Sequence, residues 1–478
     1  MSLKNSFKTF NPLKNSCNES VYISDTITEI EKKVVLATEA SKILSQKTYE
    51  DISKFLLEIK SQMISSKEQI KNTYLTETGL NQSRFEVEFK RTIYQLSHFS
   101  DFILSENWEN SHETVEHFSG KKLIKKKVGI GPILVLGASN FPLAYSTIGG
   151  DSVSALAAKC PVILKAHPYH TGTSMEVYKA ICTAIDNCGF PNGTFTHVLD
   201  SGHENATFLA QHKEIKGIGF TGSQSGGEAI INLVKSRRDE IPVFAEMGSV
   251  NPVFILDLKE SRINDLAKKL ADSVCNDRGQ FCTKPGVLFM PNNKIGNLLS
   301  IELKNNIIQY ETGPMLHPSI RENFETETSS IKHIMGDLMF FESEKKAEFH
   351  VSNKVVIISE NEFNKIEIFR KEIFGPYTTI VMYENDPINN LDLFDGQLTC
   401  SIFSEKINEE IQKESIYHLA IQKAGRVVID DVPTGVSVSK NMHHGGPYPA
   451  SSDSRFTAVG SDSINRFLRD VTIQQNLN

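Results

Sequence analysis

The sequence predicts an α/β protein whose sheets are largely parallel and buried between helices. From residue 130 to residue 256, short apolar runs alternate with segments of helical composition. Strands that are apolar along nearly their whole length are typical of parallel sheets covered on both faces, and the helices between them form the crossovers of βαβ units. A second α/β region follows from about 257 to 440. The runs that we assign to strands are 133–136, 162–164, 195–199, 218–220, 243–245, 253–256, 286–290 and 354–358.

The segments before and between these regions are predicted to be helices and an arm. From residue 26 to residue 105, apolar residues recur every three or four positions, as at Ile52, Phe55 and Ile59. This period places them on one face of a helix, so we expect the helices to pack on the α/β body. Residues 110–128 are polar and charged, which predicts a solvated hairpin or an arm that pairs with another subunit.

The composition excludes several classes of protein. The 478 residues include 51 Lys and Arg and 58 Asp and Glu, which give a net charge of −7. A general binder of nucleic acid or of membrane surfaces needs clustered cations, so neither function is expected. The N-terminus lacks the apolar core of a signal peptide, and no apolar run approaches the roughly 18 residues that span a bilayer. Seven cysteines without a Cys-x-x-Cys pair indicate free thiols in a cytoplasmic protein.

The sequence lacks three common motifs for binding nucleotides, phosphate and zinc. The dinucleotide fingerprint Gly-x-Gly-x-x-Gly is absent, and the stretch from Gly222 to Gly227 lacks the Lys-Ser/Thr of a phosphate-binding loop. That stretch nevertheless opens a predicted helix, whose N-terminus favours anions. His112 and His117 are five positions apart and therefore do not share a helix face as zinc ligands. No metal site is predicted, and the Gly-rich stretch around His444 is expected to hold one functional histidine instead.

Four short stretches carry the candidate reactive residues. They hold a thiol in Gly-Gln-Phe-Cys282, a carboxylate at the end of the strand Phe-Ala-Glu246, an amide in Ala-Ser-Asn140 and a second carboxylate in Glu372-Ile-Phe-Gly-Pro. Any one of them alone is compatible with a structural role. Together, in this order, and with Phe-Thr-Gly-Ser at 220–223, they resemble the aldehyde dehydrogenase superfamily from about residue 25 to the C-terminus.

The resemblance implies an overall organisation. An aldehyde dehydrogenase-like chain has a Rossmann-type cofactor domain, an α/β catalytic domain and a small β bridging or oligomerisation element. On this sequence we expect the NAD(P)-binding domain at 1–110 and 130–247, and the catalytic domain at 248–452. The bridging segments are then 111–129 and 453–478. The superfamily is oligomeric, so a homodimer or a homotetramer is expected.

The resemblance also implies a mechanism. The thiolate of Cys282 would attack the aldehyde carbon, because the thiolate and not the thiol is the nucleophile. The side-chain amide of Asn140 and the backbone N–H of Cys282 would bind the oxyanion. After hydride transfer has left a thioester, Glu246 would deprotonate the water that hydrolyses it.

Cofactor contacts follow from the same resemblance. Lys165 would reach the adenosine ribose, Gly222 and Ser223 would lie under the pyrophosphate, and Glu372 would hold the nicotinamide ribose with Phe374 nearby. Many NAD-preferring members carry a glutamate three residues after the lysine, and here that position is Pro168. Without that carboxylate a 2′-phosphate is not repelled, so we expect either NADP or NAD to serve, with NADP accepted.

A narrower resemblance concerns the substrate. The stretch His444-Gly-Gly-Pro is similar to the branch that contains 2-oxoglutarate semialdehyde (2,5-dioxovalerate) dehydrogenases and an NADP-dependent fatty aldehyde dehydrogenase, and it implies that His444 accepts the proton of Cys282. The expected small-molecule substrate is 2-oxoglutarate semialdehyde, with Arg91 or Arg278 binding its acid end. Arg84 is expected to form only a helix-surface ion pair with Glu88. Broad or long-chain aldehyde oxidation and a non-catalytic role remain alternatives.

Overall fold

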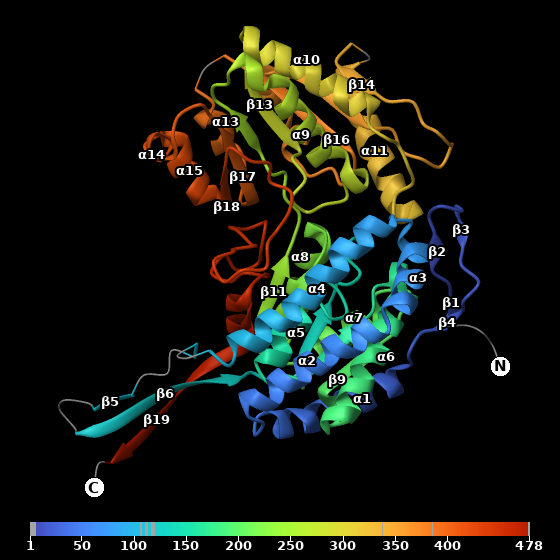
Figure 1. Ribbon diagram of the computed structural model, residues 1–478, viewed down its shortest axis with the longest axis vertical. Coiled ribbons are helices and arrows are strands. Elements are labelled where there is room, and N and C mark those ends of the chain that lie inside the picture. Colours follow the sequence, from blue (N-terminus) through green and yellow to red (C-terminus); the bar gives the residue numbers. More distant parts are fainter. Residues whose placement is uncertain are drawn as a thin grey trace.

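The computed structural model describes residues 6–105, 108–109, 113–115, 120–336, 338–384 and 386–476. Two α/β bodies lie one above the other, and a ribbon of strands projects from the lower body (Figure 1). No helix in the described ranges is long and apolar enough to cross a membrane. The chain begins with two short antiparallel pairs, β1 (Ser6–Phe7) with β4 (Tyr22–Ile23) and β2 (Phe10–Asn11) with β3 (Ser16–Cys17).

Four helices follow where the sequence predicts helical periodicity. Threonine begins the first two helices, in each case with an acidic residue three positions later that completes a capping box. The third helix ends at Gly79, which adopts a left-handed φ of 64°. The helices are α1 (Ile27–Leu44), α2 (Tyr49–Ser65), α3 (Lys67–Thr78) and α4 (Gln82–Phe102).

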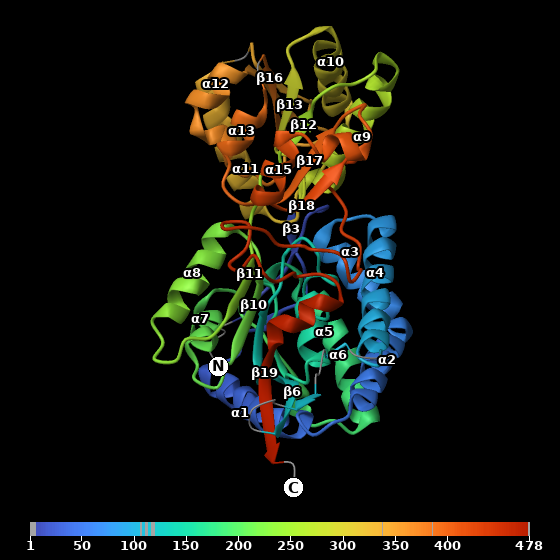
Figure 2. The same cartoon turned by 90° about the vertical axis from the view of Figure 1, so that its left-hand side faces the viewer.

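The first body is a five-stranded parallel sheet in the order β11–β10–β7–β8–β9. Alternate residues of its strands enter two different cores. In β7, Ile133 and Val135 pack with α2, α4 and α6 on one face, whereas Leu134 and Leu136 pack with α1, α7 and α8 on the other (Figure 2). The elements are β7 (Ile133–Leu136), α5 (Gly150–Ala157), β8 (Val162–Lys165), α6 (Thr171–Cys188), β9 (Phe195–Val198), α7 (Glu204–Gln211), β10 (Gly217–Thr221), α8 (Gln224–Lys235) and β11 (Val243–Glu246).

The chain order of this sheet reverses between β7 and β10. Parallel sheets bind ligands outside the carboxyl ends of the strands at such a switch point. The carboxyl ends of β7, β10 and β11 lead to Asn140, to Gly222 and Ser223, and to Glu246. The topology therefore gathers the predicted site residues of the first body at one edge.

The second body is a seven-stranded sheet in the order β14–β15–β16–β13–β12–β17–β18. Only its edge strand β14 runs antiparallel to its neighbour. The predicted domain boundary at 247 falls between β11 and β12. The strands are β12 (Val253–Ile255), β13 (Val287–Pro291), β14 (Phe340–Glu342), β15 (Lys354–Ser359), β16 (Tyr377–Tyr383), β17 (Gln397–Phe403) and β18 (Ala424–Ile429). The helices are α9 (Ile263–Cys275), α10 (Lys294–Gln309), α11 (Pro318–Met335), α12 (Glu360–Lys365), α13 (Ile388–Asp392), α14 (Asn408–Ile411) and α15 (Ser415–Lys423).

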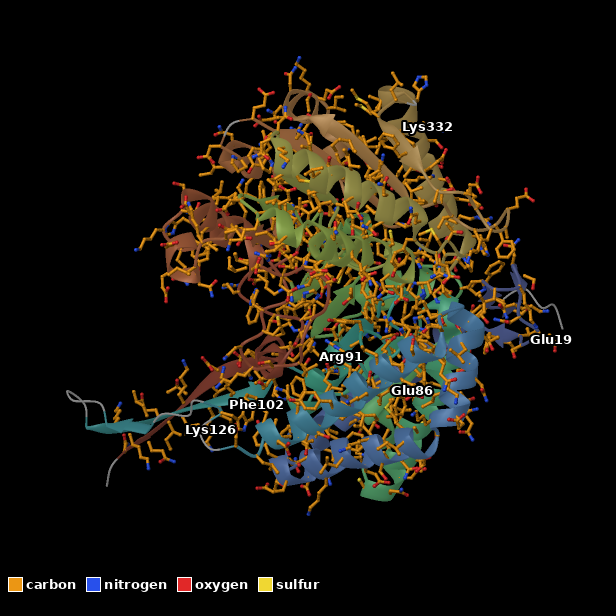
Figure 3. All side chains as sticks on the ribbon, turned by 45° about the horizontal axis from the view of Figure 1, so that its top comes forward. Glu19, Glu86, Arg91, Phe102, Lys126 and Lys332 are labelled. Carbon is orange, nitrogen blue, oxygen red and sulfur yellow. The ribbon has the colours of Figure 1, made fainter. Side chains whose placement is uncertain are left out.

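The projecting ribbon is an antiparallel sheet of β5 (Glu113–Val115), β6 (Lys121–Gly129) and β19 (Leu468–Asn476). β6 and β19 pair along their whole length, and Lys126 lies on the ribbon (Figure 3). Residues just before β19 behave differently, because Arg466 forms a 2.7 Å ion pair with Asp151 of α5 and Phe467 enters the core of the first body. Only part of the predicted segment 453–478 thus belongs to the ribbon. His112 and His117 lie outside the described residues.

Candidate active site

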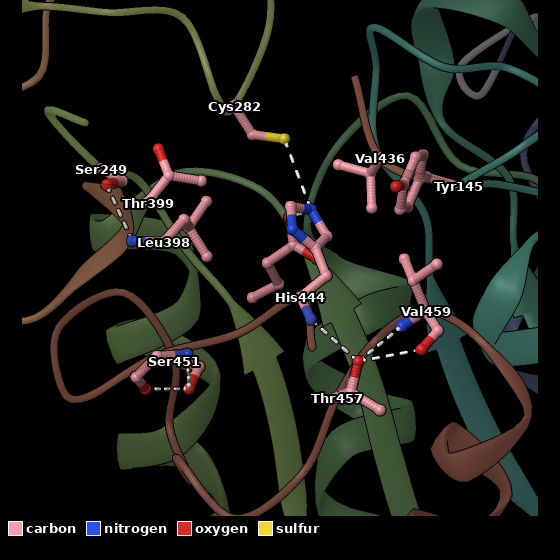
Figure 4. Close-up of polar contacts among 12 residues, drawn as sticks. Tyr145, Ser249, Cys282, Leu398, Thr399, Val436, His444, Ser451, Thr457 and Val459 are labelled. Carbon is pink, nitrogen blue, oxygen red and sulfur yellow. Dashed lines mark hydrogen bonds and ion pairs between the residues drawn. The ribbon is translucent and has the colours of Figure 1, made fainter. Parts of the chain in front are cut away.

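Three reactive side chains from distant parts of the chain meet in the structure, and Figure 4 shows two of them, the thiol of Cys282 and the imidazole of His444. The Sγ atom of Cys282 lies 3.6 Å from Nε2 of His444. The same nitrogen lies 2.8 Å from Oε1 of Glu246. The sulfur, the nitrogen and one carboxylate oxygen all lie within 4.8 Å of one another.

His444 reaches Glu246 because the chain after it pairs with the edge of the first sheet. The backbone N–H of Met247 donates to the carbonyl of Ala450, and that of Ser452 donates to the carbonyl of Ala245, both at 2.9 Å. The backbone N–H of His444 itself donates to the hydroxyl of Thr457 at 2.9 Å (Figure 4). The imidazole is buried, and these backbone hydrogen bonds fix the segment that carries it.

The loop that carries Cys282 is held in an unusual backbone conformation. Asp277 and Arg278 adopt positive φ values of 48° and 59°, which is costly for residues with a Cβ atom. Asn251 compensates from the neighbouring loop, since its side-chain amide donates to the carbonyls of Cys282 at 2.8 Å and Lys284 at 3.0 Å. These bonds fix the backbone on which the thiol stands.

Asn140 lies beside the same loop. Its Nδ2 donates one hydrogen bond to the carbonyl of Gln280 at 2.8 Å, which leaves its second N–H available. Within the described part of the chain, no acceptor is present for the backbone N–H of Cys282. Each predicted oxyanion donor therefore has a hydrogen without an acceptor among the described residues, one on Cys282 itself and one on a side chain that is bonded to the cysteine loop.

Arg84 and Glu88 do more than form the surface ion pair that we expected. Glu88 is only 1% exposed, and it accepts from the backbone N–H groups of Leu143 and Ala144, each at 2.9 Å. Arg84 forms ion pairs with two carboxylates: its Nη1 lies 3.0 Å from Oε2 of Glu88, and its Nε lies 2.6 Å from Oδ2 of Asp277. The expectation of a surface pair was wrong because sequence spacing does not reveal that α4 packs under both catalytic loops.

Arg84 also stacks on aromatic rings from those loops. Its guanidinium lies 4.3 Å from the ring centroid of Phe141 and 5.6 Å from that of Phe281. Phe141 follows Asn140 in the chain and Phe281 precedes Cys282. One arginine therefore links the loop of the amide to the loop of the thiol.

The electrostatics of the site hold Cys282 in its thiol form. Burial and then the negative charges of Glu246 and Glu372 raise the pKa of Cys282 well above its ordinary value. The positive charge of Arg426 opposes this shift. Arg426 lies in β18 and donates to the carbonyls of Pro433 and Gly435. Attack by the sulfur therefore requires a base nearby, and Nε2 of His444 is in position.

The predicted cofactor residues of the first body lie at its carboxyl edge. Lys165 ends β8, and burial lowers the pKa of its amine. In the described structure no residue accepts a hydrogen bond from its Nζ. Pro168 begins the short helix that follows, and Ser223 caps α8 by accepting from the N–H of Gly226 at 3.2 Å. A Cβ on Gly222 would lie 2.6 Å from the ring of Phe220. An exposed, glycine-shaped helix start and a lysine without an acceptor, both at the carboxyl edge of one sheet, fit a dinucleotide.

Glu372 extends from the second body across to the chain beyond β11. A Cβ on Gly248 would collide with its carboxylate, so the carboxylate lies directly against this backbone. Burial raises the pKa of Glu372 to about 7, and burial lowers the pKa of Lys284 to about 8, each charge partly offsetting the shift of the other. Phe374 lies two residues on in the same loop, whose Gly375 carbonyl packs on Gly279 of the cysteine loop.

The two candidate substrate arginines lie in different places. Arg91 stands over the ring of Tyr145 at 4.8 Å and donates to its hydroxyl at 3.1 Å, and its Nη1 is buried without an acceptor among the described residues. Tyr145 in turn lies 6.0 Å from the ring of His444. Arg278 instead packs against Gly313, with Glu311 and His350 nearby. The structure brings Arg91, but not Arg278, toward the reactive side chains.

Comparison with known proteins identifies the family. A sequence profile described as "Aldehyde dehydrogenase family" matches residues 1–469. The chain belongs to the aldehyde dehydrogenase family. This aldehyde dehydrogenase is an oxidoreductase that acts on the aldehyde group and uses NAD(P)+.

Among its curated relatives are two semialdehyde dehydrogenases. The aldehyde dehydrogenase is 33% identical over 464 residues to "Alpha-ketoglutaric semialdehyde dehydrogenase" of Acinetobacter baylyi, covering 94% of this chain and 87% of the relative. It is 31% identical to "Alpha-ketoglutaric semialdehyde dehydrogenase 2" of Azospirillum brasilense, covering 93% and 86%.

Solved structures share the fold. The aldehyde dehydrogenase superposes with a TM-score of 0.85 on betaine aldehyde dehydrogenase from Staphylococcus aureus in complex with NAD+, at 18% identity over 99% of this chain and 92% of the other. A 1-pyrroline-5-carboxylate dehydrogenase from Thermus with bound NAD gives 0.84 at 19% identity, covering 99% and 90%.

Three residues of the site are not among those predicted from the sequence. Arg426 is a charged residue inside the otherwise apolar run 424–429, and this anomaly in the strand pattern was a usable signal. Tyr145 and Lys284 had no such signal, because each is a single residue in a loop whose path the sequence does not reveal.

Proposed function

We propose that the chain oxidises 2-oxoglutarate semialdehyde to 2-oxoglutarate, with NADP+ accepted at least as well as NAD+. The observation that carries this proposal is the contact of one imidazole nitrogen, Nε2 of His444, with both Sγ of Cys282 and the carboxylate of Glu246. The names and coverage of the two curated relatives support the choice of substrate.

The reaction begins from the tautomer of His444 that carries its hydrogen on Nδ1. Nε2 then takes the proton of Cys282, and the resulting imidazolium pairs with the carboxylate of Glu246. The thiolate then attacks the aldehyde carbon, and the free N–H of Asn140 and the backbone N–H of Cys282 receive the oxyanion. Losing one such donor typically costs about 2.7–4 kcal/mol of barrier.

The second half of the reaction releases the acid. NAD(P)+, when bound, accepts the hydride. Glu246 then takes a proton from water, which attacks the thioester on Cys282 and frees the thiolate. Both oxygens of Glu246 are buried and lack a well-directed hydrogen bond among the described residues, which suits a base that has to receive a water proton.

The acid end of the substrate is assigned to Arg91. A buried N–H group of a cation that has no acceptor is unfavourable unless an anion reaches it. Arg91 forms no ion pair with any described residue, and its Nη1 lacks an acceptor. Tyr145, which Arg91 contacts, connects this cation to His444.

The cofactor preference follows from Lys165 and Pro168. Lys165 supplies a charge for a 2′-phosphate, and Pro168 places no carboxylate against it. We further assign homo-oligomer contacts to the ribbon of β6 and β19, whose long paired strands extend away from the body (Figure 1).

A substrate panel tests the proposal. The expected result is a kcat/KM for 2-oxoglutarate semialdehyde at least 10-fold above that for hexanal. Arg91→Ala is expected to abolish this preference. Arg278→Ala is the matched control, and it is expected to lower kcat/KM equally for both substrates or for neither. Equal losses with both substrates in Arg91→Ala would refute the carboxylate role, and a wild-type preference for hexanal would favour an aliphatic aldehyde dehydrogenase.

A further inference from the structure

The site has a second kind of chemistry that aldehyde oxidation does not use. A thiolate sulfur, an imidazole nitrogen and a carboxylate oxygen are the three ligand types that zinc prefers. In the described structure, Cys282, His444 and Glu246 present one of each within 4.8 Å. The sequence predicted no metal site, because these ligands lie far apart in the chain and show no ligand spacing.

The distance between the sulfur and the nitrogen matches that around a tetrahedral zinc ion, and the oxygen reaches the ion after a small shift of its side chain. With zinc bonds of about 2.3 Å to sulfur and about 2.0–2.1 Å to nitrogen, a tetrahedral angle places the two ligand atoms about 3.5 Å apart. Sγ of Cys282 and Nε2 of His444 are 3.6 Å apart. With an oxygen bond of about 2.0–2.2 Å, the same angle places nitrogen and oxygen about 3.4 Å apart. Nε2 and Oε1 of Glu246 are 2.8 Å apart and need to separate by about 0.6 Å.

The local charges also suit a divalent cation. The Cys282 thiolate and the Glu246 carboxylate together neutralise a doubly charged ion. Glu372 adds negative charge at the thiol, and the positive charge of Arg426 opposes it. Both oxygens of Glu246 are buried without a well-directed hydrogen bond from a described residue, so only the 2.8 Å contact of Oε1 with Nε2 of His444 has to loosen when the ion enters.

We propose that Cys282, His444 and Glu246 bind a single Zn²⁺ ion that reversibly inhibits the enzyme. On binding, the S–H bond of Cys282 breaks, its proton leaves to solvent, and a sulfur–zinc bond forms without any redox change. A fourth position remains for water. The metal holds the nucleophile and the imidazole together, so it excludes the aldehyde and shields the thiol from alkylation.

The test measures binding without turnover. Metal-free full-length protein is titrated with Zn²⁺ against a chromophoric chelator, and with Co²⁺ to detect the charge-transfer absorption of a thiolate-bound ion. The expected stoichiometry is one ion per chain. Cys282→Ser and His444→Gln are expected to weaken binding more than about 100-fold, since loss of even an outer partner costs 10–100-fold. Cys17→Ser, which removes an exposed thiol, is the matched control and is expected to bind as the wild type does.

Alkylation provides the second readout. Iodoacetamide labelling of Cys282, followed by mass spectrometry, is expected to slow at least 10-fold in saturating Zn²⁺ and to recover on chelation. Unchanged zinc affinity in Cys282→Ser, or labelling of wild-type Cys282 at the same rate with and without zinc, would overturn the proposal. If a variant misfolds, the cobalt spectrum and the labelling of the wild type still decide the matter. Neither readout depends on the identity of the aldehyde.

Discussion

Nε2 of His444 lies 2.8 Å from Oε1 of Glu246. The same nitrogen faces the sulfur of Cys282, so one imidazole stands between the nucleophile and the base of the proposed hydrolytic step. The arrangement requires the proton of His444 to leave before Glu246 and a water can work on the thioester. It also explains how a thiol whose pKa is raised by burial and by two carboxylates can react.

His444→Gln is expected to reduce kcat by about 10²-fold or more, because general acid–base groups contribute 10²–10⁴-fold. The alkylation rate of Cys282 near neutral pH is expected to fall as well. Rapid-mix assays with iodoacetamide measure the second effect directly. His443→Gln is the matched control, since it changes the adjacent histidine, and its rates are expected to stay within two-fold of the wild type. A normal alkylation rate in His444→Gln would show that another group takes the proton.

Arg84→Gln is expected to lower kcat by about 10²-fold, because a displacement of about 1 Å in a reacting group has that cost. The arginine holds Asp277 and Glu88 and lies on Phe141 and Phe281, so both catalytic loops shift when it is lost. The KM for NADP+ is expected to remain unchanged, and Arg84→Lys is expected to restore only part of the rate. Lys90→Gln, an exposed change on the same helix, serves as the control. A kcat within two-fold of the wild type in Arg84→Gln would rule out the positioning role.

The affinity for the cofactor is expected to rise with pH. Burial raises the pKa of Glu372 to about 7, and its ionised form is the one that accepts hydrogen bonds from ribose hydroxyls. Between about pH 6 and pH 8 the ionised fraction rises roughly 10-fold, so the KM for NADP+ is expected to fall by a similar factor. Glu372→Gln is expected to raise KM and to flatten this profile. A wild-type KM for NADP+ that does not change with pH would show that the ionisation of Glu372 does not affect cofactor binding.

Pro168→Glu is expected to lower kcat/KM for NADP+ by at least about 10-fold relative to NAD+, because the new carboxylate would repel a 2′-phosphate beside Lys165. Initial rates with both cofactors and one aldehyde measure the ratio. Pro168→Gln has nearly the same shape without the charge, and it is expected to retain the wild-type ratio. The same change in ratio in both variants would indicate a backbone effect of losing the proline.

Much of the fold was predictable because the local sequence identifies its strands. Runs such as 133–136 and 354–358 are apolar throughout, and the structure forms β7 and β15 there. The residues at 461–467 were not predictable, since Arg466 and Phe467 return to the first body through long-range packing. Their sequence alone does not separate them from the ribbon that follows.

The candidate site was predictable where a residue ends a strand. Glu246 and Lys165 each close an apolar run, so their position at the edge of the sheet follows from the pattern. The position of the Arg278 side chain was not predictable. It depends on positive φ values at Asp277 and Arg278 that no feature of the sequence indicates. The burial of Arg84 depends on how α4 meets two loops far along the chain.

Mass spectrometry of Glu246→Gln tests whether Cys282 forms the thioester that Glu246 helps to hydrolyse. The variant is mixed with 2-oxoglutarate semialdehyde and NADP+, quenched in acid and digested. We expect a burst of about one NADPH per chain and an acyl adduct on the peptide that contains Cys282, because the thioester forms but is not hydrolysed. NADPH formation at the wild-type steady rate, or an adduct on another cysteine with Cys282 unmodified, would contradict this expectation.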